Sequence, residues 1–403
     1  MTSKHWAFSI LLAVLAVWGN RSFATETPKS VPVSSDAALV EKGLAVGFVD
    51  FAHRLEASEL LRTAQAAQRA RVGLWSQRRA PHPFRSDGSF RRASPSDLRG
   101  VALPMHSLEE HHDYERELSE IVELGATWVS LQVVTQQPLV DSSEIPLASE
   151  RTPSDKRIRE TIGRARELGL EVLLLPIVLI RAPGPEDWRG TLAPTDRATW
   201  WESYSSFLLH MVDLAADAGA SAVSIGSELA SMEKDEERWK LLIANARMRF
   251  GGCLTYSSNW DHFDEIGFWR QLDFAGMTAY FELYDGPSPT LADLDAGWRL
   301  AKLEMERLAR FSHHRVLFTE VGMPSLKGAA AAPWDYTAQG ESDHELQRLS
   351  FEAFGNVFLK GRGKDDPFLG MLLYDWWGEG GAGDTTYTAR GKPAAKVWTE
   401  LLR

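Results

Sequence analysis

The chain has 403 residues, of which 44% are hydrophobic and 25% charged, an ordinary globular composition that excludes disordered, collagen-like and polytopic membrane proteins. A single cysteine, Cys253, excludes an intramolecular disulfide, so a large core must stabilise the fold. The net charge is −11, and residues 93–403 hold 31 basic against 48 acidic side chains, which argues against a nucleic-acid partner and favours a neutral substrate.

Residues 1–24 have the features of a signal peptide. Lys4 precedes a run of 13 residues, Trp6–Trp18, that is apolar except for Ser9, and Ser22-Phe23-Ala24 offers small residues where signal peptidase requires them. The run is shorter than the roughly 18 residues of a membrane span. We therefore expect cleavage after Ala24 and a secreted or periplasmic protein. An uncleaved N-terminal anchor that holds the protein outside the cytoplasm is the alternative.

Residues 25–93 are expected to form a helical and linker segment without recognisable chemistry. A Pro/Ser/Thr-rich stretch, Thr25–Ser35, precedes apolar residues at helical spacing over Asp36–Trp75, which predict one or two helices. The Arg/Pro/Ser-rich stretch Arg78–Ser96 indicates a second linker. The arginines of Arg62–Arg92 fit a solvated linker, and weak association with an anionic surface is the alternative.

From Leu98 onward, short apolar runs alternate with amphipathic helices, a pattern typical of a parallel sheet with helical crossovers. The eight predicted strands are Gly100–Pro104, Thr127–Val133, Glu171–Pro176, Ala222–Ile225, Cys253–Ser257, Phe274–Ala279, Val316–Thr319 and Met371–Tyr374. The six predicted helices are Tyr114–Leu124, Asp155–Leu168, Thr199–Ala218, Glu236–Phe250, Ala292–Arg310 and His344–Leu359. This order predicts that residues 94–403 form one α/β domain, a (β/α)8 TIM barrel.

Two glutamates stand at strand ends, where the active site of such a barrel lies. Glu228 follows the fourth strand and Glu320 directly follows the seventh. Burying a carboxylate there is costly unless the site uses it, and strands 4 and 7 face each other across the barrel mouth. Retaining cleavage of a glycoside needs such a pair, with carboxyl groups about 5 Å apart. The alternative is an ion-paired arrangement that only closes the strand ends.

Several stretches of the barrel carry a family signal. They are Ile225–Leu229, Leu254–Tyr256, Asn259–Trp260, Phe268–Trp269, Leu272–Asp273, Thr278–Phe281, Phe318–Gly322, Tyr387–Thr388, Arg390–Ala394 and Val397. In these stretches the chain resembles glycoside hydrolase family 113, a family of retaining β-glycosidase barrels in clan A. The resemblance covers about residues 98–403. It implies an endo-acting β-1,4-mannanase, with β-mannan or manno-oligosaccharide as substrate.

The resemblance also implies a role for each glutamate. Glu228 takes the acid/base role and Glu320 the nucleophile role in a double displacement. A nucleophile must stay ionised, and Tyr280, at the end of the sixth strand, is placed to donate a hydrogen bond to Glu320. Capping of a barrel layer is the other interpretation of this tyrosine. The wider clan has Asn before the acid/base residue, whereas Ser227 stands there in this chain, which implies a shorter or water-mediated contact with the sugar.

Further polar and aromatic residues are candidates for the sugar subsites. They follow strands 5 and 8 or lie in longer loops, where indole faces can stack on pyranose rings: Asn259, Trp260, Trp376, Trp377, Trp188 and Trp334. For the loop tryptophans, packing within the protein is the alternative. After the third strand, the run Pro176–Ile180 is apolar where polar groups facing a sugar are expected.

No cofactor or catalytic metal is expected. The segment His106–Asp113 is rich in possible ligands but lacks both metalloprotease spacings, and the sequence has no phosphate-binding glycine loop. The leading hypothesis is a retaining endo-β-mannanase. One alternative keeps the mechanism and changes the sugar, to a β-glucan, or is an exo-acting β-mannosidase or β-glucosidase. Another is a barrel that binds glycan without cleaving it.

Overall fold

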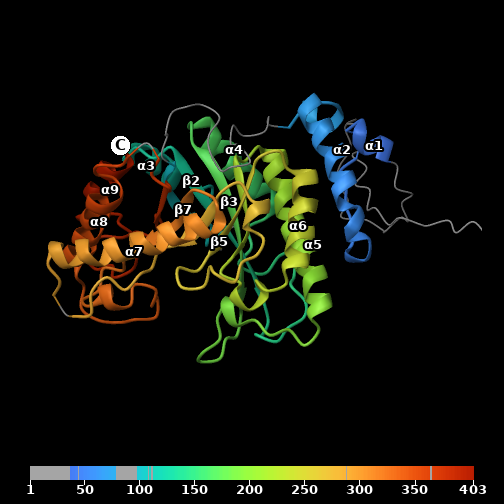
Figure 1. Ribbon diagram of the computed structural model, residues 1–403. Helices are drawn as coiled ribbons and strands as arrows, with labels where there is room; N and C mark the ends of the chain where they lie inside the picture. The colour runs from blue at the N-terminus through green and yellow to red at the C-terminus, as the bar shows by residue number, and fades with distance from the viewer. Residues whose placement is uncertain are drawn as a thin grey trace, which may run out of the picture.

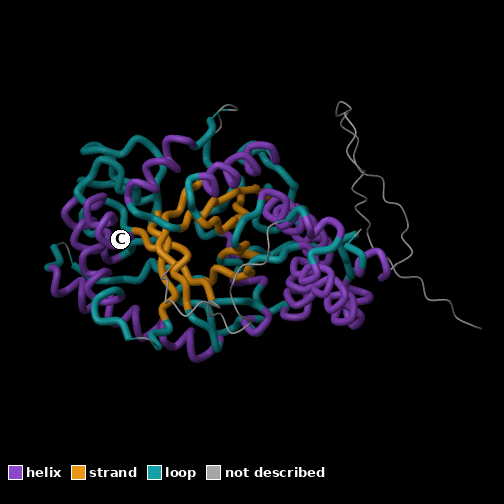
Figure 2. Tube along the Cα trace, turned by 90° about the horizontal axis from the view of Figure 1, so that it is seen from above, coloured by secondary structure: helices purple, strands orange, loops and turns teal. Residues whose placement is uncertain are grey.

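Eight parallel strands close into a barrel in the computed structural model, which describes residues 37–43, 45–78, 98–107, 109, 112–286, 288–363 and 365–403. The strands follow one another around the barrel in chain order. Figure 2 shows them as a central ring of orange segments surrounded by purple helices. They are β1 Leu98–Pro104, β2 Trp128–Gln137, β3 Glu171–Ile180, β4 Ala222–Ser227, β5 Cys253–Ser258, β6 Ala275–Thr278, β7 Val316–Gly322 and β8 Phe368–Tyr374. The predicted (β/α)8 TIM barrel is confirmed.

The strands are buried on both faces. In β3, Leu173 and Leu175 point into the barrel interior, where they join the buried thiol of Cys253. Their neighbours Val172 and Leu174 belong instead to the core between the barrel and the helices. This alternation follows from the two-residue period of a strand, and it explains why the strands are nearly continuous apolar runs in the sequence.

Seven helices cover the outside of the described barrel (Figure 1). They are α3 Glu115–Leu124, α4 Asp155–Glu167, α5 Arg197–Ala218, α6 Glu236–Arg249, α7 Leu291–Ser312, α8 His344–Phe358 and α9 Ala394–Leu402. Local sequence sets their ends: Asp196 and Thr290 accept backbone N–H groups at two N-termini, and Gly125 and Gly219 end two helices with positive φ. Each of the six predicted helices begins and ends within two residues of the corresponding helix in the structure. Only α9 has no predicted counterpart, because its nine residues offer few helical repeats.

Strands β2 and β3 are longer than the others. Each has ten residues, against four to seven elsewhere, and they stay paired as far as Gln137 and Ile180. The predicted ends at Val133 and Pro176 are therefore wrong. The apolar run Ile177–Ile180 is strand and not a sugar-facing loop, because its side chains alternate between the barrel interior and the outer core.

The segment before the barrel packs against α6. It contains α1 Ala37–Glu41, η1 Phe51–Glu56, α2 Ala57–Ala70 and η2 Gly73–Ser76. Figure 1 shows α1 and α2, in blue, beside α5 and α6. The buried Asn245 of α6 accepts a hydrogen bond from the Val49 N–H at 2.8 Å and donates one to the Val49 carbonyl at 2.9 Å. The helices predicted within Asp36–Trp75 are confirmed, and they belong to the outer layer of the barrel.

Parts of the N-terminal prediction fall outside the described residues. These parts are the signal peptide 1–24, the stretch Thr25–Ser35 and nearly all of the second linker. Within the described part, Arg78 binds inside the protein, to Asp217 at 3.0 Å and to the Arg249 carbonyl. This contact gives no support to an anionic-surface association. Where the structure describes the chain, no helix combines the length and the apolar character needed to cross a bilayer.

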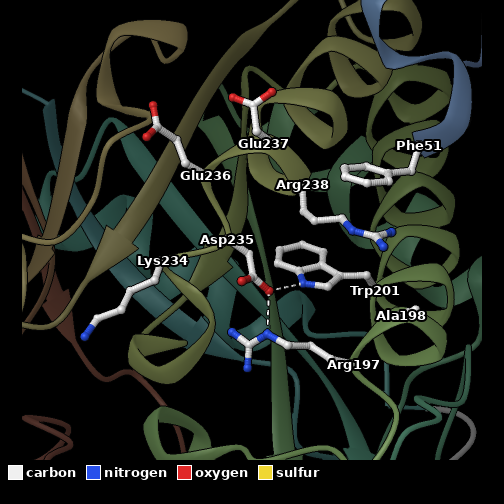
Figure 3. Close-up of a pocket in the computed structure, with 9 residues that line it drawn as sticks. All are labelled: Phe51, Arg197, Ala198, Trp201, Lys234, Asp235, Glu236, Glu237 and Arg238. Atoms are coloured by element: carbon white, nitrogen blue, oxygen red, sulfur yellow. Dashed lines mark hydrogen bonds and ion pairs between the residues drawn. The ribbon is translucent and has the colours of Figure 1, made fainter.

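An open pocket of about 440 Å³ lies where the N-terminal segment meets α5 and α6 (Figure 3). It is lined by Phe51, Arg197, Ala198, Trp201, Lys234, Asp235, Glu236, Glu237 and Arg238. The guanidinium of Arg238 lies 3.7 Å from the centroid of the Phe51 ring, and Asp235 accepts hydrogen bonds from two neighbours. Cations and carboxylates are present in equal number, so the pocket has no dominant charge. Neither predicted catalytic glutamate lines it.

Asn245→Ala should weaken the attachment of the N-terminal segment. The substitution leaves the N–H and the carbonyl of Val49 without their partner in a buried place. We expect a loss of about 2–3 kcal/mol in the free energy of unfolding, measured with urea. Asn356→Ala is the control, because Asn356 is half-buried and bonds only to the side chains of Asp295 and Lys360. Equal losses in both variants would contradict a specific role of Asn245.

Candidate active site

Both predicted glutamates are buried at the barrel mouth. Glu228 directly follows β4, and Glu320 is the fifth residue of the seven-residue β7. They are 6% and 4% exposed. The charge of Glu228 acts on Glu320, so the two carboxyl groups share one electrostatic environment. The structure therefore brings together the two residues that the sequence singles out.

Two neutral donors hold the carboxyl group of Glu320. The Tyr280 hydroxyl donates to Oε2 at 2.6 Å, as the sequence analysis predicts. The side-chain amide of Gln132, on β2, donates to Oε1 at 2.7 Å. With both oxygens engaged from different sides, the carboxyl group has one orientation. Sequence reasoning did not include Gln132, although a glutamine inside an apolar strand is itself a signal of a buried polar role.

The pKa of Glu320 is raised from 4.5 to about 7. Burial is the largest cause and the neighbouring charge of Glu228 is the second, while Arg189, Tyr280 and Gln132 act in the opposite direction. The three opposing groups favour the ionised form that a nucleophile needs. Glu320 is therefore predominantly ionised only above neutral pH.

Glu228 stands on a strained turn of the backbone. Its φ is +52°, a left-handed conformation that costs a non-glycine residue about 1–2 kcal/mol. Its N–H donates to the Ser257 carbonyl at 2.8 Å, next to an irregularity in the pairing of β4 with β5. The hydroxyl of Ser227 is buried and has no hydrogen-bond partner among the residues that the structure describes. A residue held in such a conformation is typical of a functional site.

A buried network supports the backbone behind Glu228. The N–H of Leu229 donates to the Tyr256 hydroxyl at 2.9 Å, and this hydroxyl donates to Glu233 at 2.7 Å. Burial raises the pKa of Glu233 to about 7. The network fixes the chain immediately after the strained residue, so it keeps the Glu228 side chain in place.

Arg189 enters the site from the loop after β3. It begins the short helix η3 (Arg189–Thr191), its side chain is 19% exposed, and its guanidinium forms an ion pair with Oε2 of Glu228. Its Nε is buried without a hydrogen-bond partner. The sequence analysis named the adjacent Trp188 but not Arg189, and no local pattern distinguishes this arginine from those on the surface.

Aromatic side chains extend from the glutamates toward solvent. Trp260 stacks on Trp334 with ring centroids 5.3 Å apart, and packs edge-on against Tyr280 at 6.2 Å. Trp334 is 36% exposed. Asn259 is buried, and its side-chain oxygen accepts the N–H of Trp260 at 2.9 Å. The structure thus places Asn259, Trp260 and Trp334 together beside Tyr280, where a flat apolar face can meet a sugar ring.

Trp376 lies on the other side of the barrel wall, so its prediction as a subsite residue is corrected. Its Nε1 donates to Glu120 of α3 at 2.8 Å. Its ring packs against Trp398 of α9, with centroids 5.8 Å apart, and lies under the guanidinium of Arg390. After β8 the chain turns this side chain outward, where it joins the terminal helix to the barrel.

Trp377 and Trp188 pack within loops. Trp377 makes edge contacts with His106 and His112, at 6.3 and 5.6 Å, in the connection after β1. The ring of Trp188 lies directly over Gly190, where a Cβ would come within 2.2 Å of it. Both fit the packing interpretation. In the part of the chain that the structure describes, no three His, Cys, Asp or Glu side chains gather as potential metal ligands.

Comparisons with known proteins identify the family of the chain. A family model described as Glycoside Hydrolase Family 113 matches residues 108–392. The structure is similar to the family 113 β-mannanase of Alicyclobacillus acidocaldarius in complex with ManMIm, with 25% identity, a TM-score of 0.67, and coverage of 76% of this chain and 97% of that chain. A second family 113 β-1,4-mannanase, also solved as a complex, has 22% identity and a TM-score of 0.66, with coverage of 76% and 98%. A family 5 mannosidase of Rhizomucor miehei shares the fold, with 11% identity, a TM-score of 0.54, and coverage of 79% and 96%. No curated protein matches the chain.

Glu320→Gln should stabilise the protein at alkaline pH. Because the pKa of this carboxyl rises from 4.5 to about 7 on folding, wild-type stability is complete below about pH 4.5 and falls as the pH rises through about 7. The loss reaches about 3 kcal/mol. A glutamine amide does not ionise, so the variant does not suffer this loss of stability. In urea unfolding, the free energy of unfolding of the variant should therefore exceed that of wild type by up to about 3 kcal/mol at about pH 8. This difference should disappear toward about pH 4.5.

Glu341→Gln serves as the control for this measurement. Glu341 is 82% exposed, so its substitution should produce no gap that depends on pH. A gap for Glu320→Gln that has the same size at both pH values would show that the pKa of Glu320 is not raised.

Proposed function

Because the chain belongs to Glycoside Hydrolase Family 113, we propose that it is a retaining endo-β-1,4-mannanase. Membership of the family makes the chain a glycoside hydrolase. The mannan substrate is supported by the two family 113 β-mannanases to which the structure is similar. The observation that carries the mechanism is the pair of buried glutamates, with Glu320 held by two neutral donors and Glu228 beside it.

Glu320 is the nucleophile in this proposal. Its ionised carboxylate attacks the anomeric carbon, and the bond from that carbon to the leaving-group oxygen breaks as Glu228 gives its proton to that oxygen. A covalent glycosyl-enzyme forms. Tyr280 and Gln132 orient the carboxylate for attack, and their hydrogen bonds favour its ionised form before the bond forms.

Glu228 acts as a base in the second step. Its carboxylate takes a proton from a water molecule, the water oxygen attacks the anomeric carbon, and the bond to Glu320 breaks. This step returns both glutamates to their starting states and retains the configuration of the sugar. The strained backbone and the network behind it hold Glu228 at one position for both proton transfers.

The aromatic surface is the proposed sugar subsite. The stacked pair Trp260 and Trp334 offers an indole face beside Tyr280, and apolar faces of pyranose rings bind to such surfaces. The proposed partners of sugar hydroxyl groups are the amide of Asn259 and the hydroxyl of Ser227, which has no partner in the described part of the chain. A sugar hydroxyl would satisfy the buried Ser227 group.

Hydrolysis of a panel of β-1,4-mannan, β-glucan and xylan oligosaccharides tests the function. We expect mannan oligosaccharides to be cut internally, and Glu320→Ala to lose at least about 10³-fold in kcat. Exclusive release of one sugar from a chain end would replace the endo assignment with the exo-acting alternative. Binding of a glycan without hydrolysis, unchanged in Glu320→Ala, would show a barrel that binds and does not cleave.

Tyr280→Phe should move the acidic limb of the pH profile of kcat/KM to higher pH. The Tyr280 hydroxyl lowers the pKa of Glu320, so without it the pKa rises above about 7. Activity that needs the ionised nucleophile is then lost at a higher pH, by about one unit.

Tyr387→Phe is the matched control for Tyr280→Phe. The ring of Tyr387 packs against Tyr280, but its hydroxyl donates to the Pro333 carbonyl at 2.7 Å and not to Glu320. The acidic limb of the kcat/KM profile of Tyr387→Phe should stay within about 0.3 pH units of that of wild type. A limb that stays in place in Tyr280→Phe would contradict the role of this hydrogen bond.

A further inference from the structure

Arg189 is a fixed part of the site and not a surface side chain that happens to reach it. The loop around it is bound on two sides. The Leu192 carbonyl accepts a hydrogen bond at 2.7 Å from Ser231, in the short helix η4 (Ala230–Met232) that follows Glu228. The N–H groups of Ala193 and Thr195 donate at 3.0 Å to carbonyls in the connection after β2. The backbone around Arg189 is therefore held in place.

The ion pair between Arg189 and Glu228 conflicts with the reaction. A general acid must bring a carboxyl oxygen to about 2.6–3.2 Å from the leaving-group oxygen. In the structure the guanidinium lies against Oε2 of Glu228. A guanidinium has no proton to give at neutral pH, because arginine stays protonated in proteins. Arg189 and the leaving sugar thus compete for the same carboxyl group.

The surroundings of Arg189 can accept its charge after it leaves Glu228. Its charge also interacts with Glu320, Tyr280 and Tyr374, and its Nε is buried without a hydrogen-bond partner. A short rotation of the side chain keeps the cation among these groups. The ion pair with Glu228 therefore need not be kept while substrate is bound.

We propose that Arg189 is a positioning residue that binds Glu228 in the empty enzyme and is displaced by the sugar on the leaving-group side. The inference rests on the proposed function, because it takes Glu228 as the acid/base. In the ion pair Arg189 compensates the charge of Glu228 and orients it. Once the sugar has displaced Arg189, Glu228 takes up a proton from solvent and can then act as the acid. Substrate must break this pair, so Arg189 lowers the affinity for any glycan that spans the cleavage point.

The test is the binding of β-1,4-mannohexaose, measured by calorimetry in the Glu320→Gln background, where hydrolysis does not interfere. Arg189→Met removes the charge and keeps most of the side-chain volume. It should tighten binding about tenfold. Arg189→Lys keeps the charge and should bind within about twofold of its parent.

A double-mutant cycle separates this role from a structural one. In a background that carries Glu228→Gln as well as Glu320→Gln, the ion pair is already absent. Arg189→Met should then change the affinity less than about twofold, whereas damage to the loop would weaken binding equally in both backgrounds.

Unchanged or weaker binding of Arg189→Met in the Glu320→Gln background overturns the proposal. These outcomes are distinguishable from failure of the proposed function. If wild type cleaves mannohexaose and the cycle shows no coupling, the role of Arg189 alone is wrong. If wild type neither cleaves nor binds mannohexaose, the proposed function is wrong and the role of Arg189 fails with it.

Discussion

The burial of two carboxyl groups side by side is the constraint on which the rest of the site depends. Glu228 and Glu320 are each less than a tenth exposed, and the charge of one raises the pKa of the other. Such a pair is stable only if neighbours compensate it. Here the compensation is divided: Glu320 receives hydrogen bonds from Tyr280 and Gln132, and Glu228 receives the charge of Arg189. The same groups that make the burial tolerable also orient the pair for chemistry.

The barrel supplies this arrangement because it brings distant strands to one mouth. The donors to Glu320 come from β2 and from the residues after β6, while Glu228 follows β4. A core on both sides of each strand holds these positions rigid, which allows Glu228 to keep an unfavourable backbone conformation. The stability of the core thus sustains a strained site. The segment before the barrel adds to the outer layer at α6.

Sequence reasoning recovers features with a strong local period and misses those set by distant contacts. The eight strands and two glutamates could be predicted because an apolar run followed by a carboxylate is visible in the sequence. The length of β3 could not, because a strand that continues beyond the barrel has the same apolar pattern as one that ends. Trp376 points outward and Arg189 inward because of the turns after their strands, and no sequence pattern encodes the direction of either.

The stereochemistry of hydrolysis tests the account most directly. In the account, Glu320 forms a covalent bond to one face of the sugar, and Glu228 then activates water on the opposite face, from which the leaving group departed. The first product must therefore have the configuration of the substrate. Proton NMR during the first minutes of mannohexaose cleavage should therefore show the β-anomer of the new reducing end before mutarotation produces the α-anomer. Initial appearance of the α-anomer would mean direct attack by water, and would contradict Glu320 as the nucleophile.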